Sequence, residues 1–265
     1  MSRSITHYLT KHLPENNQWE RIWILAKTDF KLRYYETTLG LIWAFLHPII
    51  RMVIYWVVFS YILNQNIPNY GMYIFSGLIV WTYFQEATRK GLMILRNKRY
   101  LYENIRMNPY DGFTSSVLST VINLAFNVLV FVALSPVFDI AFSFQVLWIF
   151  PILLNLVVLV YAISLILAVL NSFLKDISQV WDVFLLGMFW INPIFYAKTL
   201  IFESFPALMY INPIAGIIVN LRDALMYAQA PDMSLFWFDW VYAFALLGIG
   251  MWVFNSFFHK AMEKL

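Results

Sequence analysis

Four long stretches of this chain contain no aspartate, glutamate, lysine or arginine. They cover residues 52–85, 112–138, 140–174 and 240–258. Each stretch approaches or exceeds the roughly 20 apolar residues that a helix needs to cross a bilayer. Only helices and closed barrels satisfy the backbone hydrogen bonds inside lipid. Barrel strands would alternate in polarity, whereas these stretches are apolar on all sides. We therefore predict an all-α membrane protein.

The composition supports this prediction. Of the 265 residues, 61% are hydrophobic and only 12% are charged, whereas a soluble domain usually has about 25% charged residues. The deficit is too large to assign to one apolar core. Cysteine is absent, which excludes disulfide bonds, thiolate metal sites and a cysteine nucleophile.

Turn-forming and charged residues divide the chain into six predicted transmembrane helices. The predicted spans are residues 39–63, 72–87, 113–134, 147–170, 180–196 and 237–258. The pair Asn192-Pro193 interrupts the fifth span near its end. Residues 199–231 contain three prolines and the charged residues Glu203, Arg222 and Asp223, so no continuous span fits there. Since broken backbone at membrane depth must be covered by protein or water, we expect two short re-entrant half-helices in this segment.

Residues 1–38 are polar and basic, and too charged for a signal peptide. A helical wheel gathers five apolar residues on one face: Trp19, Ile22, Trp23, Ala26 and Phe30. This pattern predicts an amphipathic helix in the membrane interface, where tryptophan is favoured. An alternative is a cytosolic helix that packs on a neighbour. The predicted organisation is a cytoplasmic segment, 1–38, followed by a transmembrane domain, 39–265.

The distribution of basic residues predicts the orientation, because cytoplasmic loops carry an excess of lysine and arginine. Fifteen of the 18 lysine and arginine residues fall in the N-terminal segment, between the second and third spans, at Lys175 or in the C-terminal tail. Only Lys198 and Arg222 fall on the opposite side, and Arg51 lies within the first span. We expect both termini in the cytoplasm, which favours six spans over seven, and a location in the cytoplasmic (inner) membrane.

Sequence patterns for catalysis are missing. The chain has no Gly-x-x-x-x-Gly-Lys-Ser/Thr phosphate-binding loop and no Gly-x-Ser-x-Gly elbow. The four histidines are scattered, whereas metal ligation needs a cluster. Asp176 and Asp182 do not share a helix face. We therefore predict that the chain is not an enzyme and holds no metal or cofactor of its own.

The charged residues Arg51, Glu86 and Asp182 fall within predicted spans. Charges inside a membrane are candidates for a functional role. The alternative, which we favour for Glu86 and Asp182, is that the side chains reach the headgroups from helix ends. For Arg51 the two readings are balanced, because His47-Pro48 predicts a kink just before it.

Aromatic residues are frequent in the first two spans and near the break at Asn192-Pro193. Their rings could stack on the faces of sugars, although packing in the core or against lipid is the favoured explanation for any single ring. The predicted substrate path consists of Arg51, Tyr55, Phe59, Trp81, Tyr83, Phe84, Phe195 and Tyr196.

Several short motifs, in order and spacing, carry a family resemblance. They are Thr-Asp-Phe-Lys-Leu-Arg-Tyr at 28–34, Leu-Gly-Leu-Ile-Trp-Ala-Phe-Leu-His-Pro at 39–48, Gly-Leu-Ile-Val-Trp-Thr-Tyr-Phe at 77–84, Asn-Pro-Ile at 192–194 and 212–214, and Leu-Arg-Asp at 221–223. The chain resembles, over nearly its full length, the membrane subunit of ABC-2-type exporters of polysaccharides such as O-antigen, teichoic acid and capsule. It departs from the family pattern at Val80, where many members have proline, and at Lys175-Asp176, where Arg-Asp is usual.

The resemblance implies partners and a substrate. Two copies of the permease would form a pore, and two separate ATPase chains would bind ATP and Mg. Segment 96–110 would be the first cytoplasmic coupling segment, and 199–231 the external gate region. The implied contacts with the ATPase are Tyr100, Glu103, Arg106, Lys175 and Asp176. The implied substrate is a polyprenyl-diphosphate-linked glycan, with O-antigen the first choice.

Other interpretations are a permease for drugs or lipids, a membrane-embedded enzyme that acts on polyprenyl-linked glycans, and a scaffold without a transport role. A drug site would be a closed apolar cavity, and an enzyme would need paired acids. The chain is expected to contact membrane lipid and no nucleic acid.

Overall fold

The computed structural model describes residues 17–34, 38–63, 67–105, 107–202 and 206–265, which are mostly helical and contain no strand. The α-helices are α2 (Gln18–Tyr34), α3 (Ile42–Leu63), α4 (Tyr70–Leu92), α5 (Ile94–Asn97), α6 (Arg99–Asn104), α7 (Pro109–Leu134), α8 (Ile149–Phe173), α9 (Ile177–Ile191), α10 (Lys198–Phe202), α11 (Ala207–Ile211), α12 (Pro213–Met226) and α13 (Met233–Lys264). Two 3-10 turns, η1 (Ser135–Phe138) and η2 (Phe144–Trp148), lie between α7 and α8.

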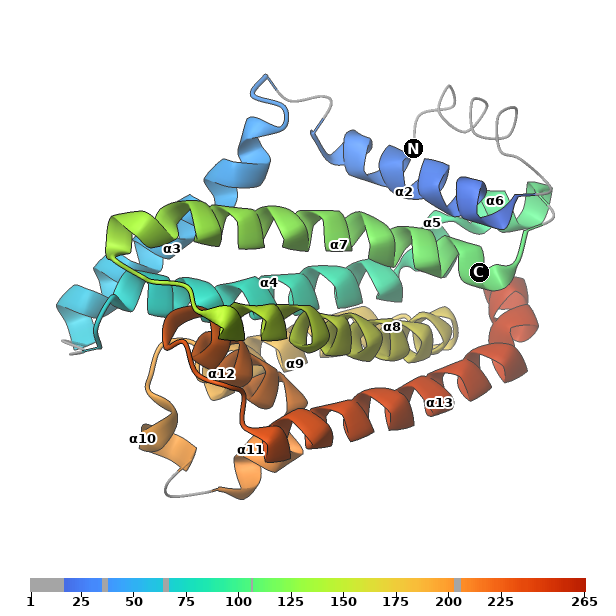
Figure 1. The fold of residues 1–265 in the computed structure, drawn as a ribbon. Helices are drawn as coiled ribbons and strands as arrows, with labels where there is room; N and C mark the ends of the chain where they lie inside the picture. Colours follow the sequence, from blue (N-terminus) through green and yellow to red (C-terminus); the bar gives the residue numbers. More distant parts are fainter. Residues whose placement is uncertain (1–16, 35–37, 64–66, 106, 203–205) are drawn as a thin grey trace.

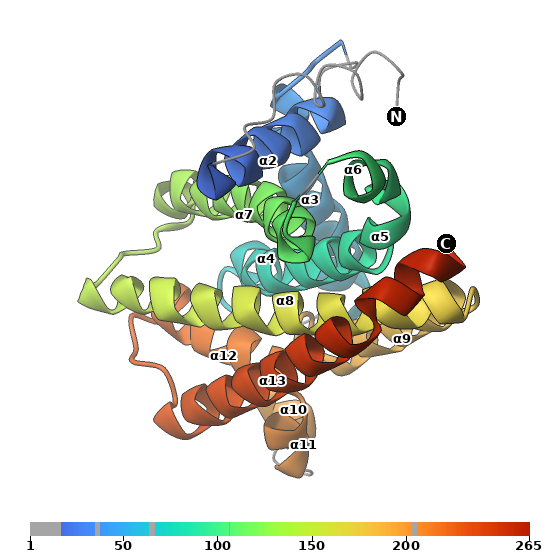
Figure 2. The same ribbon diagram turned by 90° about the vertical axis from the view of Figure 1, so that its right-hand side faces the viewer.

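Helix α4 is the centre of the fold. It packs against α3, α7, α8 and α12, and every residue from 70 to 81 is buried. Figure 1 shows α4, α7 and α8 running side by side, with α2 along α7. The view turned by 90° shows α13 crossing α8 in close contact (Figure 2). The main hydrophobic core therefore forms around α4.

Four helical segments in the described part of the chain are long and apolar enough to cross a membrane. They are Ile42–Tyr61, Pro109–Phe138, Phe144–Phe173 and Met233–Lys264. These coincide with four of the six predicted spans. The other two predicted spans, 72–87 and 180–196, coincide with α4 and α9. Helix α4 is less apolar because it carries Glu86, Arg89 and Lys90, and α9 has only 15 residues.

Several predicted helix boundaries differ from the observed ones. Helix α4 continues to Leu92, beyond the expected end at 87, and α9 ends at Ile191 rather than at 196. Asn192 has extended backbone angles (φ −72°, ψ 144°), as expected of a residue before proline. In segment 199–231 three helices, α10, α11 and α12, occupy the described residues where two half-helices were expected. Residues 214–225 of α12 are all buried.

The non-helical backbone after α9 receives its hydrogen bonds from side chains. Tyr70 Oη donates to the carbonyl of Phe195 at 2.6 Å, and Tyr73 Oη donates to that of Tyr196 at 2.8 Å. Arg222 donates to the carbonyl of Pro193 at 3.0 Å. Broken backbone is tolerated at membrane depth only when such partners replace the helical hydrogen bonds. These contacts therefore stabilise the break.

Arg222 connects three segments of the core. The sequence predicts that Arg222 lies on the non-cytoplasmic side of the membrane. In the structure its side chain is buried within the protein, with only 3% exposed. Its guanidinium lies 3.5 Å from the centre of the Tyr73 ring and donates to Ser76 Oγ and to the carbonyl of Tyr73, both at 3.2 Å. At Gly77 a Cβ atom would lie 3.1 Å from Arg222 Nη2 and 3.2 Å from the Cα of Ile194. The absence of a side chain there permits the close approach.

The two Asn-Pro-Ile motifs contact each other. Asn212 Nδ2 donates to Asn192 Oδ1 at 3.0 Å, and Asn212 Oδ1 accepts from the backbone N–H of Ile214 at the start of α12. One asparagine thus caps α12 and also binds the residue that ends α9. The repetition of the motif at a spacing of twenty residues becomes a contact between the two helix ends.

Helix α2 packs on α7, and its residues Ile22, Leu25 and Ala26 are buried. Trp19 and Trp23 were expected to share one face with Ile22 and Ala26, but they are 77% and 52% exposed. The helix therefore packs on α7 and presents two tryptophans outward; its predicted place in the membrane interface stays a prediction.

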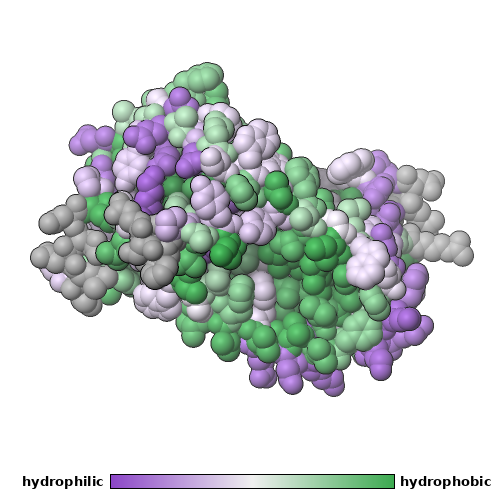
Figure 3. Space-filling model, turned by 90° about the horizontal axis from the view of Figure 1, so that it is seen from below, coloured by the Kyte–Doolittle hydropathy of each residue, from purple (hydrophilic) through white to green (hydrophobic). Residues whose placement is uncertain are grey.

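Apolar side chains cover much of the outer surface. Figure 3 shows a broad hydrophobic area on the face seen from below, with hydrophilic residues gathered toward its margins. In the most apolar stretch of each of these four segments, only 17% to 61% of the residues are buried inside the protein. The remaining apolar surface is available for lipid or for another protein chain.

The contacts of Arg222 lead to a prediction about stability. The substitution Arg222→Met leaves the carbonyl of Pro193 without this donor, whereas the carbonyl of Tyr73 still accepts from Ser76 Oγ. An unpaired buried acceptor costs about 1–3 kcal/mol, and the contact with the Tyr73 ring is lost as well. We expect the free energy of unfolding to fall by at least about 2 kcal/mol, measured as loss of the monodisperse protein on heating in detergent. Lys198→Met is the matched control, because the Lys198 side chain is 52% exposed and only one ion pair, with Asp223 at 3.6 Å, joins it to another described residue. Equal stability of the two variants would contradict the role given to Arg222.

Candidate functional site

Two adjoining cavities lie between α3, α4, α7 and α9. Their volumes are about 570 Å³ and 400 Å³, and they share the lining residues Arg51, Leu78, Thr82, Gln85 and Arg89. We call the two together the polar groove. Its charged and polar lining consists of Arg33, His47, Arg51, Thr82, Gln85, Glu86, Arg89, Lys90, Asn123, Asn127 and Asp182.

One face of α4 forms the floor of the polar groove. The shared residues Leu78, Thr82, Gln85 and Arg89 are three or four positions apart, a spacing that places side chains in one row along a helix. Helix α7 contributes a second such row with Asn123 and Asn127. Polar residues thus line the groove inside helices that are otherwise apolar.

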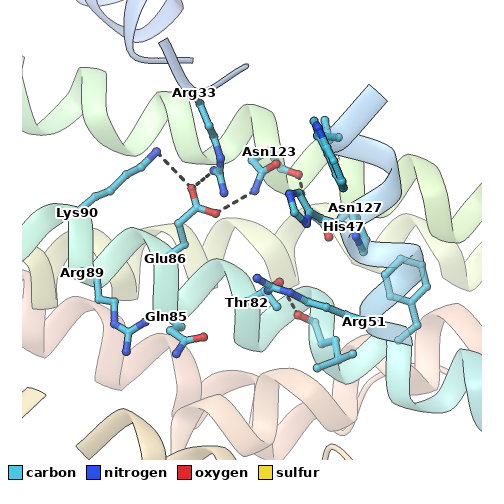
Figure 4. A pocket seen from close by; sticks show the side chains of 15 residues that line it. Arg33, His47, Arg51, Thr82, Gln85, Glu86, Arg89, Lys90, Asn123 and Asn127 are labelled. Atoms are coloured by element: carbon cyan, nitrogen blue, oxygen red, sulfur yellow. Dashed lines mark hydrogen bonds and ion pairs between the residues drawn. The ribbon is translucent and has the colours of Figure 1, made fainter. Parts of the chain in front are cut away.

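Glu86 is the centre of an ionic network in the groove (Figure 4). Its carboxylate accepts from Arg33 at the end of α2, from Lys90 at 3.2 Å and from Asn123 Nδ2 at 3.0 Å. Figure 4 shows these three side chains converging on Glu86 from α2, α4 and α7. A single carboxylate therefore contacts two cations and joins three helices.

The second ion pair joins α4 to α9. Arg89 Nε lies 2.7 Å from Asp182 Oδ1, and both side chains are about half exposed. Arg51 lines both cavities, and no hydrogen bond or ion pair joins it to another described residue. The lining contains four cationic side chains, Arg33, Arg51, Arg89 and Lys90, against the two acids Glu86 and Asp182. The polar groove has a net charge of +2, which favours an anion.

Aromatic rings from α3, α9 and the break after α9 gather beside the groove. Phe59 stacks on Phe195 with ring centres 4.2 Å apart and planes at 10°. Tyr55 lies 5.2 Å from Phe195 and 5.9 Å from Phe189. Trp190 lies 5.8 Å from Phe195. We call these five residues the aromatic cluster. Tyr55 and Phe189 also line the smaller cavity, so the cluster continues from the groove.

The structure brings only part of the predicted substrate path together. Arg51, Tyr55 and Trp81 line the polar groove, and Phe59 and Phe195 belong to the aromatic cluster. The hydroxyl of Tyr196 donates to the carbonyl of Ile191, so this ring packs against the end of α9.

Tyr83 and Phe84 do not line either cavity. They are 4% and 1% exposed and belong to the hydrophobic core around α4. They face away from the row formed by Leu78, Thr82, Gln85 and Arg89, because consecutive residues of a helix point in different directions.

The predicted coupling residues lie on exposed surface, except for Arg106, which is outside the described residues. Tyr100 is exposed on α6, and Glu103 is exposed and pairs with Arg99 at 2.5 Å. Lys175 and Asp176 are exposed between α8 and α9. The opposite side of the segment is anchored: Leu101 is buried, and Tyr102 donates to the carbonyl of Pro109 at 3.1 Å. Burial raises the pKa of Tyr102, so its hydroxyl remains a donor at neutral pH.

Sequence reasoning missed several groove residues: Arg33, Thr82, Gln85, Arg89, Lys90, Asn123 and Asn127. The spacing of three or four positions on α4 and α7 predicts that these polar residues share a helix face. Sequence reasoning considered only charged residues within the spans and so missed the uncharged ones. Among the described residues, no three histidine, cysteine, aspartate or glutamate side chains form a cluster that could hold a metal ion.

Comparisons with known proteins agree on one family. A family model described as ABC-2 type transporter matches residues 20–226. The chain is similar to an O-antigen export system permease protein RfbA of Klebsiella pneumoniae, with 25% identity over 244 residues that cover 91% of this chain and 93% of the relative. It is also similar to a protein of the same name from Myxococcus xanthus, with 27% identity over 248 residues, or 91% and 92% of the two chains.

The charge balance of the groove predicts its response to substitution. Glu86→Gln raises the net charge of the lining from +2 to +3, and we expect inorganic pyrophosphate to bind several-fold more tightly, with a steeper loss of affinity as salt increases. Calorimetric titration of the detergent-solubilised chain measures both effects. Glu263→Gln makes the same charge change at the exposed end of α13 and should leave the affinity unchanged. Equal effects of the two variants would mean that pyrophosphate binds elsewhere.

Proposed function

The chain belongs to the ABC-2 type transporter family, and we propose that it is the membrane permease of an ATP-driven exporter that moves O-antigen polysaccharide across the cytoplasmic membrane. The names of the Klebsiella and Myxococcus relatives support this substrate, since the similarity covers more than nine-tenths of each chain. The chain is a transport subunit, and the interpretation as an enzyme is set aside.

One observation carries the proposal: a cationic groove continues into a cluster of aromatic rings on an otherwise apolar chain. A lipid-linked glycan has matching parts. Its diphosphate would pair with arginine and lysine side chains, which form strong charge-assisted hydrogen bonds with phosphate oxygens. Its sugars would pass over Tyr55, Phe59 and Phe195, since ring faces accept sugar C–H groups without selecting one pattern of hydroxyls. We therefore assign a polyprenyl-diphosphate-linked polysaccharide as the substrate.

Energy for transport would come from a separate pair of ATPase chains that bind ATP and Mg. The exposed residues Tyr100 and Glu103 on α6, with Arg106 next to it in sequence, form the proposed first contact with the ATPase. Lys175 and Asp176 form the proposed second contact. The observation that supports this role is the two-sided character of the segment: one side is anchored through Leu101 and Tyr102, and the other is exposed and charged.

A second copy of the chain would complete the pore. Helices α3 and α9 border the polar groove, and each exposes a row of apolar side chains. On α3 these are Ile50, Val53, Ile54, Trp56, Val57, Val58 and Tyr61, and on α9 they are Val180, Val183, Phe184, Leu186, Trp190 and Ile191. In a homodimer that buries these two helices, the grooves of both copies would face one shared path, and membrane lipid would cover the remaining apolar surface.

The proposed topology has six spans, with α4 and α9 added to the four most apolar segments. Both termini would lie in the cytoplasm, and α10 to α12 would form a re-entrant region on the outer side. The distribution of lysine and arginine supports this orientation. A permease for drugs or apolar lipids is the second candidate, but the net positive charge of the groove favours an anionic substrate.

Co-purification tests the proposed function directly. The chain, solubilised gently from its native cells, should bring down an ATPase in equal amount. The turnover of this ATPase should respond to polyprenyl-diphosphate-linked O-antigen and not to the delipidated glycan. Mass spectrometry and phosphate release measure the two results. A chain that purifies without an ATPase would contradict the assignment as an exporter subunit.

The proposed contact with the ATPase predicts the effect of a charge reversal. Glu103→Arg should lower the substrate-stimulated ATP hydrolysis of the complex about tenfold, because an interface charge is replaced by its opposite. The temperature of unfolding should not change, since Glu103 is exposed. Glu263→Arg, also exposed, is the matched control. Full stimulation in the Glu103 variant would remove this residue from the interface.

A further inference from the structure

We propose that α2 controls the charge of the polar groove according to the position of the coupling segment. This inference rests on the proposed function, because it assigns a regulation to the groove and to the segment that contacts the ATPase. It depends on three ion pairs that α2 makes with three different elements.

The three pairing residues of α2 occupy one side of the helix. Arg21, Asp29 and Arg33 are eight and four positions apart, so successive side chains are rotated by only about 80° and 40°. Arg21 pairs with Asp111 of α7. Asp29 pairs with Lys98, which lies between α5 and α6, and Arg33 pairs with Glu86 of α4. Lys27, on the outer side of the same helix, is exposed. The charges of α2 thus connect the coupling segment with the groove.

The first ion pair is a firm anchor. Arg21 donates to Asp111 Oδ2 through Nε at 2.9 Å and Nη2 at 2.6 Å, and Gln18 donates to Asp111 Oδ1 at 2.8 Å. The Asp111 side chain is completely buried. Removal of one partner would leave an uncompensated buried charge, which is strongly unfavourable. This end of α2 therefore stays fixed to α7.

The second ion pair attaches α2 to the coupling segment. Lys98 Nζ lies 2.7 Å from Asp29 Oδ2, and Lys98 also donates to Ser115 Oγ at 2.7 Å. Beside it, the buried side chains of Leu25 on α2 and Leu101 on α6 belong to one hydrophobic cluster. A displacement of the coupling segment would consequently be passed to α2 at Asp29.

The third ion pair reaches the groove. Arg33 is the only residue of α2 among those that line the cavities, and it pairs with Glu86. Both side chains are partly exposed, at 35% and 21%, so this pair separates more easily than the buried anchor. Withdrawal of Arg33 lowers the net charge of the lining from +2 to +1. The groove would then hold an anionic substrate less tightly.

The spacing along α2 gives a lever. With a rise of 1.5 Å per residue, Asp29 lies about 12 Å and Arg33 about 18 Å from the anchor at Arg21. A rotation of α2 about the anchor therefore displaces Arg33 about 1.5 times as far as it displaces Asp29. The movement of the coupling segment would be converted into a larger movement of a groove cation, which couples the ATPase to binding and release of the diphosphate.

The test is a binding measurement on the full chain in detergent with geranylgeranyl diphosphate as the probe. Asp29→Ala removes the attachment to Lys98, which keeps its bond to Ser115, and we expect about fivefold weaker binding, within the usual range of coupling between sites. Arg33→Gln removes the groove cation and should weaken binding to a similar degree. If Asp29 acts through Arg33, then Asp29→Ala has no further effect in the Arg33→Gln background.

Lys27→Ala, on the exposed side of α2, is the matched control and should bind like the parent chain. Asp29→Leu serves if Asp29→Ala unfolds, since leucine is a good helix former of similar length and also removes the attachment to Lys98. Parent-like affinity of the folded Asp29 variant, or additive effects of Asp29→Ala and Arg33→Gln, would overturn the lever and leave the proposed function intact. A parent chain that fails to bind the probe would overturn both the lever and the diphosphate substrate.

Discussion

The buried guanidinium of Arg222 holds together the part of the core where α4, α12 and the break after α9 meet. It joins α12 to α4 through the carbonyl of Tyr73 and to the break after α9 through the carbonyl of Pro193. A charge inside a membrane is expensive unless hydrogen bonds and dipoles replace its hydration. Here two carbonyls, the hydroxyl of Ser76 and the ring of Tyr73 do so.

The aromatic cluster depends on this arrangement. Phe195 stacks on Phe59 because the backbone from 193 to 196 is fixed by Arg222, Tyr70 and Tyr73. The same chain break that ends α9 therefore positions the ring at the centre of the cluster. One set of hydrogen bonds therefore determines both the backbone conformation after α9 and the position of the aromatic rings along the proposed glycan path.

Much of the fold was predictable from the sequence. Uncharged stretches located the long helices, and Asn192-Pro193 located the end of α9 within a few residues, because proline restricts its predecessor whatever the tertiary context. The central position of α4 was not predictable. The segment of α4 has the lowest mean hydropathy of the six spans, because polar residues that line the groove lower it. The sequence does not show that the neighbouring helices bury the other residues of α4.

The candidate site was predictable only in part. Arg51, Tyr55 and Trp81 line the groove, but Tyr83 and Phe84, from the same aromatic run, are core residues. Sequence alone does not fix the rotation of a helix that is apolar on all sides. The ion pairs of α2 were equally hidden, because Asp111 and Lys98 are distant in sequence and each charge looks like a solvated residue.

The central place of α4 has a consequence for how the chain enters the membrane. Helices α3, α7, α8 and α13 contain segments apolar enough to partition into lipid by themselves, whereas α4 does not. A segment that carries charged residues inserts less readily on its own, because each charge at the middle of a span costs about 2.5–3.5 kcal/mol. The polar side of α4 faces α7 and α9 across the groove, so it is covered only after these later helices have been synthesised. Substitutions at the polar positions of α4 would therefore change the amount of protein that is inserted into the membrane before they change the folded structure.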